Sequence, residues 1–296
     1  MELWVLLTLA AAFLQNLRSL LQKRLTGVLS SNGASYVRFC YALPFALIYV
    51  AVLIREQGLP GTTPGFWAYC LAGSVAQLLA SASLLSAFTL RSFAVSTALS
   101  KTEAVQAAVF GFVLLGDSLS AGAVAGLAVS LLGVLLLTSA LRPADFLRSE
   151  RGLLLGLLAG AGLAVAAVCF RGAALALEEG SAMLRAALAL TVALIVQTVM
   201  MAAYLRLREP GELGRVGFAW RRGIWVGLFG VAASVGWFTA MALEAAALVR
   251  ALGQVELLFA LITSWLVFRE RLRARELVGV ALLLGGIYLL LVPGAA

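Results

Sequence analysis

The sequence of 296 residues contains no histidine. Without an imidazole, histidine-based proton shuttles, haem ligation and most catalytic triads are excluded. Its three cysteines, Cys40, Cys70 and Cys169, are scattered and show no CxxC spacing. Neither a disulfide framework nor a zinc site is therefore expected. No glycine-rich phosphate loop follows a strand-like segment, so we expect no cofactor.

Charge is also scarce, and long apolar runs dominate. Charged residues make up 12% of the chain and hydrophobic residues 62%, with a mean hydropathy of +1.02. Helix-length apolar runs of about 20 residues recur, each enough to cross a bilayer, and none alternates as a barrel strand would. The sequence predicts an all-α polytopic membrane protein. The ten expected spans are 3–23, 34–54, 66–89, 92–115, 120–140, 152–174, 182–204, 222–243, 247–268 and 274–293.

The basic residues follow the topology of these spans rather than forming a nucleic-acid surface. Fifteen of the 22 lie in loops after odd-numbered spans: Lys23, Arg24, Arg91, Arg142, Arg148, Arg151, Arg206, Arg208, Arg215, Arg221, Arg222, Arg269, Arg271, Arg273 and Arg275. By the positive-inside rule these loops are cytoplasmic and both termini are periplasmic. The net charge of +8 therefore implies no nucleic-acid partner.

The chain contains an internal repeat. The stretch from Gly33 is echoed from Gly180, and further on Glu103 aligns with Glu256. Aligned glycines include Gly126 with Gly279 and Gly133 with Gly286. We predict a first repeat at 1–141, a cytoplasmic linker at 142–151 and a second repeat at 152–296. Five spans per repeat is an odd number, so the second is inverted relative to the first around a central cavity, as in alternating-access transporters.

Two polar clusters lie near the centres of the fourth and ninth spans. Ser100, Lys101 and Glu103 belong to the fourth span, and Gln254 and Glu256 belong to the ninth. A charge deep in hydrocarbon costs at least about 2.5–3.5 kcal/mol on insertion scales, so it faces a cavity or a partner. Lys101 and Glu103 are two residues apart and do not face each other on one helix. We expect these residues at a substrate or coupling-ion site.

The first span carries a polar stripe at helical spacing, composed of Gln15, Arg18, Ser19 and Gln22. Such a stripe lines an aqueous cavity or packs on another helix. We expect Arg18 to lie within reach of Glu103 or Lys101, because a buried arginine needs a carboxylate or several carbonyls.

Trp237 lies on an aromatic face of the eighth span, which is either a packing surface or a wall of the substrate site. Glu256 is flanked by Val255, Leu257 and Leu258, whereas Glu103 has Lys101 nearby in the chain. Apolar surroundings disfavour a charged carboxylate. We therefore expect Glu256 to be the protonatable member and Glu103 to stay charged.

The chain resembles the EamA branch of the drug/metabolite transporter superfamily over its whole length. The resemblance is carried by Arg38, Gly116-Asp117, Gly126, Gly133, Arg269-Glu270, Gly279 and Gly286. It implies a small-molecule permease, usually an exporter of amino acids, other metabolites or toxic compounds. The proline common in the middle of spans four and nine is replaced here by Ala104-Val105 and Leu257-Leu258, so no relative's substrate is carried over.

Taken with the resemblance, these features indicate a secondary transporter of the bacterial inner membrane and not an enzyme. Its partners would be a small-molecule substrate, the lipid bilayer and, as an option, protons. A monomer would suffice because both repeats lie in one chain. Two alternatives stay open: a membrane-embedded lipid-modifying enzyme, and a structural or receptor-like membrane protein that transports nothing.

The arginine distribution makes a testable prediction about the N-terminus. A cysteine introduced before Trp4 should react with an impermeant thiol reagent in intact spheroplasts, because both termini are expected outside. Labelling only after the membrane is permeabilised would contradict this topology.

Overall fold

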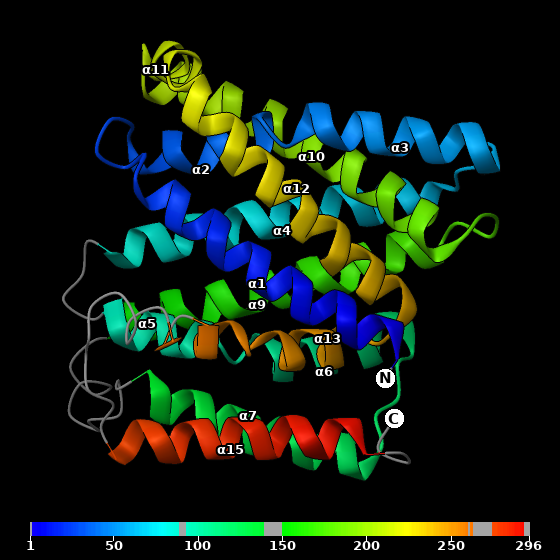
Figure 1. Cartoon of the computed structure of the whole chain (residues 1–296), viewed down its shortest axis with the longest axis vertical. Coiled ribbons are helices and arrows are strands. Elements are labelled where there is room, and N and C mark those ends of the chain that lie inside the picture. The colour runs from blue at the N-terminus through cyan, green and yellow to red at the C-terminus, as the bar shows by residue number, and fades with distance from the viewer. Residues whose placement is uncertain (1, 89–92, 139–149, 260, 263–273, 293–296) are drawn as a thin grey trace. The chain divides into compact units, whose positions relative to one another are not determined.

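The computed structural model describes residues 2–88, 93–138, 150–259, 261–262 and 274–292, and the elements in these ranges are all helices (Figure 1). They are α1 (Leu3–Lys23), α2 (Ser31–Cys40), α3 (Leu43–Gln57), α4 (Pro64–Phe88), α5 (Phe93–Ser100), α6 (Glu103–Leu115), α7 (Ala121–Leu137), α9 (Glu150–Leu175), α10 (Ala182–Arg208), α11 (Glu212–Phe218), α12 (Trp220–Leu243), α13 (Ala246–Gly253) and α15 (Ala274–Leu291).

Eight helices in the described ranges are long and apolar enough to cross a membrane, and α7 is a shorter apolar helix. Two of the eight are counted across short breaks, one joining α2 to α3 and the other joining α5 to α6. The expected ninth span, 247–268, and the linker at 142–151 run partly outside the described residues. The multi-pass membrane fold is therefore confirmed, and the count of ten stays a prediction.

The break in the second span has a local cause. α2 ends at Cys40 and α3 begins at Leu43, with Pro44 in its first turn. Proline has no N–H to donate, and the first turn of a helix is the place where none is needed. The chain therefore restarts a helix at this point.

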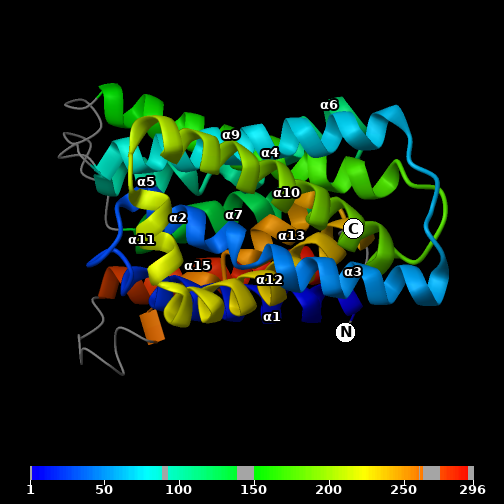
Figure 2. The same cartoon turned by 90° about the horizontal axis from the view of Figure 1, so that it is seen from above.

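The helices form two compact units. The first consists of Met1–Val75 and Cys169–Leu243, and the second of Ala76–Val168 and Glu244–Ala296. Each unit thus draws on both sequence repeats, whose own boundaries stay a prediction. In the first unit α1 lies along α12, and α10 packs on α2, α3 and α12 (Figure 1, Figure 2). In the second unit α7 lies along α15, and α6 packs on α13.

The contact between α7 and α15 is made by glycines. A methyl group added at Gly133 would lie 2.7 Å from the carbonyl oxygen of Gly279, and one added at Gly286 would lie 2.7 Å from that of Gly126. The two backbones therefore touch, as small residues allow between membrane helices. Residue numbers fall along one helix as they rise along the other, so α7 and α15 are antiparallel.

Adjacent glycines offer a matched test of this contact. Gly286→Ala should lower the thermal unfolding temperature of the purified protein in detergent, because overpacking typically costs about 1–3 kcal/mol. Gly285→Ala should be neutral or slightly stabilising, since a methyl group there meets no atom within 4 Å. Equal effects of the two substitutions would contradict close packing at Gly286.

Candidate functional site

The fourth span is interrupted where its charged residues lie. Lys101 and Thr102 form a turn between α5 and α6. The Lys101 N–H donates to Ala98 O at 3.1 Å, and the Thr102 N–H donates to Leu99 O at 3.0 Å. Both bonds span three residues instead of four, so the chain tightens to a 3₁₀ turn at this point.

The ninth span has the same interruption at the aligned residues. After α13 ends, the Gln254 N–H donates to Ala251 O at 3.2 Å, and the Val255 N–H donates to Leu252 O at 3.1 Å. These donors and acceptors align one for one with those of the fourth span, in the register that pairs Glu103 with Glu256. Two repeat-related helices are therefore broken at one equivalent point.

Polar side chains donate hydrogen bonds to backbone carbonyl groups around the first break. The Ser100 hydroxyl donates to Thr97 O at 2.7 Å, and the Thr102 hydroxyl donates to Leu99 O at 2.6 Å. Gln254 reaches the break from the other repeat, and its Nε2 donates to Lys101 O at 3.1 Å. The broken backbone is thus satisfied by polar side chains, as hydrocarbon surroundings demand.

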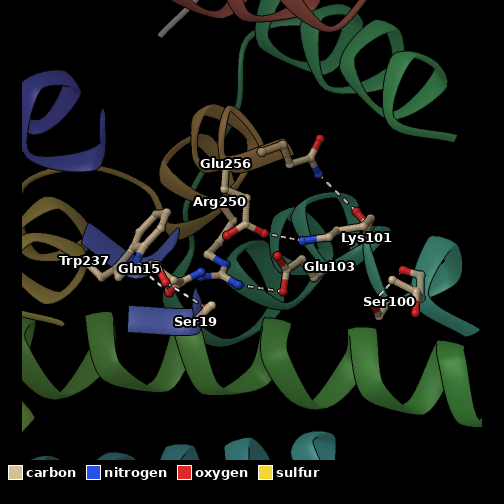
Figure 3. Close-up of polar contacts among 10 residues, drawn as sticks. Gln15, Ser19, Ser100, Lys101, Glu103, Trp237, Arg250 and Glu256 are labelled. Atoms are coloured by element: carbon tan, nitrogen blue, oxygen red, sulfur yellow. Dashed lines mark hydrogen bonds and ion pairs between the residues drawn. The ribbon is translucent and has the colours of Figure 1, made fainter. Parts of the chain in front are cut away.

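Four charged side chains of the second unit pair across the repeats (Figure 3). Lys101 Nζ contacts Glu256 Oε1. Arg250 Nη2 lies 2.7 Å from Glu103 Oε2. Each pair joins one residue from the first repeat to one from the second, and the four formal charges sum to zero. The lysine and arginine pairs are crossed, since each glutamate takes its cation from the opposite repeat.

The two carboxylates differ in exposure. The Glu103 side chain is 5% exposed and that of Arg250 is 18% exposed, whereas the Glu256 side chain is 23% exposed. Glu256 is therefore the carboxylate that a ligand or a proton reaches more easily.

Glu256 was expected among the apolar residues Val255, Leu257 and Leu258 with no cation beside it, but Lys101 binds it. Lys101 and Glu103 diverge around the helix axis, so the lysine turns to the opposite repeat. Arg250 was not predicted as a site residue, although it lies within the expected ninth span. Its sequence signal was helical spacing: it lies one turn before Gln254.

Gln254 carries a buried acceptor available to a ligand. The residue is 2% exposed, and its Oε1 has no hydrogen-bond partner among the described residues. An unsatisfied buried acceptor costs about 1–3 kcal/mol. A ligand that donates a hydrogen bond there would recover this cost.

The polar stripe of α1 lies in the first unit and contacts its neighbours there. The Trp237 Nε1 donates to Gln15 Oε1 at 3.1 Å, and Gln22 Nε2 donates to Ala34 O at 3.0 Å. Ser19 is exposed and donates to Gln15 O within its own helix.

Arg18 packs on α12: its Cδ lies 3.4 Å from the position that a methyl group at Gly230 would take. Arg18 and Glu103 belong to different units, so their expected proximity stays a prediction.

The described residues contain no group of three or more histidine, cysteine, aspartate or glutamate side chains that could hold a metal ion.

The sequence profile described as the EamA-like transporter family matches residues 2–139 and 150–292. A solved crystal structure of a protein is similar over 97% of this chain and 96% of its own, with a TM-score of 0.74 and 17% identity. A likeness at that identity shows the fold alone. No curated protein matches the sequence.

The buried pair of Glu103 and Arg250 should dominate the stability of this region. Glu103→Gln should lower the unfolding temperature in detergent, because breaking a buried pair costs about 3–5 kcal/mol. Removing both partners with Glu103→Gln/Arg250→Gln should recover part of that loss. Glu256→Gln serves as the matched control, with a smaller loss expected from its greater exposure. An unfolding temperature unchanged by Glu103→Gln would contradict the pairing.

Proposed function

The chain belongs to the EamA-like transporter family, and from this premise we propose that it exports a small metabolite such as an amino acid. It would act as a secondary transporter of the bacterial inner membrane, by alternating access and with proton coupling as an option. The observation that carries the proposal is the pair of equivalent helix breaks joined by crossed ion pairs. Broken helices at the membrane midplane are where secondary transporters bind substrates and coupling ions.

The charge arrangement favours a zwitterionic substrate. An amino-acid carboxylate could replace Glu256 on Lys101, and its ammonium group could approach the fixed charge of Glu103. Gln254 Oε1 is a buried acceptor suited to the same ammonium group. Such an exchange leaves the net charge of the site unchanged, so a zwitterion avoids the desolvation cost of an unpaired charge.

Helix pairing supports the inverted repeats. Spans at equivalent places of the two repeats pack on each other: α7 on α15, α3 on α10, and α6 of the fourth span on α13 of the ninth. α7 and α15 are also antiparallel at their paired glycines. Direct contact between equivalent, antiparallel helices is what a two-fold axis in the membrane plane would produce.

For coupling, we favour Glu256 as the proton carrier and Glu103 as the permanent charge. Glu103 pairs with an arginine, which stays protonated in proteins, whereas Glu256 pairs with a lysine. Glu256 is also the more exposed of the two carboxylates. Protonation of Glu256 would release Lys101 for a substrate carboxylate while the arginine pair stays intact.

Proteoliposomes test both the substrate class and the coupling. A screen with labelled amino acids should identify one that accumulates under a pH gradient. With that amino acid, Glu256→Gln should keep binding and lose the dependence on the gradient, because glutamine cannot take up the proton. Glu103→Gln should weaken binding of this amino acid, with the bound amount measured per mole of folded protein.

The outcomes separate the parts of the proposal. Wild-type, gradient-driven accumulation by Glu256→Gln would contradict its role as carrier. Failure of every amino acid in the screen would contradict the substrate class. Turnover of labelled lipid by the purified protein would favour the lipid-modifying enzyme instead.

A further inference from the structure

The first unit contains a cavity of about 470 Å³ near the start of α12. It lies among the connection from α1 to α2, helix α11 and the first residues of α12. Its lining residues are Leu25, Val28, Leu29, Arg215, Phe218, Ala219, Arg221 and Arg222. The arginine distribution places these segments on the expected cytoplasmic side, and none of the lining residues belongs to the crossed ion pairs.

Hydrogen bonds hold the connection from α1 to α2 against α11. Glu212 Oε1 accepts the Ser30 N–H at 2.6 Å. Glu209 accepts the Ser30 hydroxyl at 2.5 Å and Asn32 Nδ2 at 2.7 Å. Nearer the end of α11, the Tyr41 hydroxyl donates to Val216 O at 2.9 Å. The walls of the cavity are thus positioned by the protein itself and do not need a ligand to form.

The lining of the cavity is basic. It contains Arg215, Arg221 and Arg222 and no carboxylate residue, and Arg215 pairs with Glu212 at 3.2 Å. No ion pair in the described part of the chain engages Arg221 or Arg222, and both residues are exposed. Guanidinium groups bind phosphate oxygens through paired hydrogen bonds. The charge of the cavity therefore complements a phosphate.

Apolar and aromatic side chains lie beside these arginines. Leu25 and Leu29 are buried, while Phe218 is 91% exposed and Val28 is 55% exposed. Trp220 is 52% exposed, and the Arg221 guanidinium lies 5.6 Å from its ring centroid. Exposed tryptophan next to arginine is typical of the membrane–water boundary. A ligand at this site would carry a phosphate beside an apolar portion.

We propose that this cavity binds the headgroup of an anionic phospholipid from the leaflet on the arginine-rich side. Arg221 and Arg222 contact the phosphodiester, and Val28 and Phe218 contact the glycerol and the upper acyl chain. Basic pockets at the cytoplasmic ends of membrane helices bind anionic headgroups in this way. The proposal does not depend on which substrate is transported.

Native mass spectrometry of the full-length protein in detergent tests it, with phosphatidylglycerol and phosphatidylcholine as probes. Phosphatidylglycerol should bind more tightly, and added salt should weaken it. Arg221→Gln/Arg222→Gln should weaken phosphatidylglycerol binding roughly 30-fold, as expected for two basic contacts near a membrane surface. Its unfolding temperature without lipid should stay near that of the wild type, because both side chains are exposed.

Arg206→Gln/Arg208→Gln is the matched control, since it removes the same charge from exposed positions that do not line the cavity. This control should bind phosphatidylglycerol like the wild type. Equal losses of phosphatidylglycerol binding in the two double variants would mean that general surface charge causes the effect, and would overturn the proposed site. Equal binding of the two lipids, or full competition by inorganic phosphate, would also overturn it.

Discussion

A charge in the interior of a membrane protein must be neutralised by a partner, and the second unit depends on this constraint. Lys101, Glu103, Arg250 and Glu256 are the charged residues of the fourth and ninth spans, whose other residues are uncharged. Leaving one of them alone would cost several kcal/mol. The crossed pairing meets this cost with partners from opposite repeats. It also ties the two breaks together, because Gln254 bonds the carbonyl group of Lys101.

Apolar length alone predicted much of the fold. The first span was expected at 3–23, and α1 runs from Leu3 to Lys23. Helix ends in polar segments were harder to place: α10 continues to Arg208, beyond the expected end at residue 204. Helix α11 was not expected at all. It follows Pro210 and Gly211 and has seven residues, too few for hydrophobic periodicity to identify.

The two carboxylates of the candidate site could be predicted from the sequence, but the helix breaks beside them could not. Glu103 and Glu256 were recognisable because charge is rare in these spans and the repeats align them. The 3₁₀ turn at Lys101 and Thr102 was not, since no proline or glycine marks it. Which cation binds which glutamate depends on how two helices pack. Spacing along one helix shows that Lys101 and Glu103 do not face each other, but it does not identify the residue that each of them binds. Arg250 was missed for that reason.

The glycine contact between α7 and α15 also bears on how such a chain could arise. Gly126 aligns with Gly279, and Gly133 aligns with Gly286. The contact joins Gly126 to Gly286 and Gly133 to Gly279. In a dimer of two identical first repeats, Gly126 of one copy would therefore contact Gly133 of the other, and Gly133 of the first copy would contact Gly126 of the second. That surface is self-complementary, as a two-fold interface requires. A single repeat thus carries the geometry to assemble with a copy of itself, and gene fusion would preserve the contact without inventing a new one.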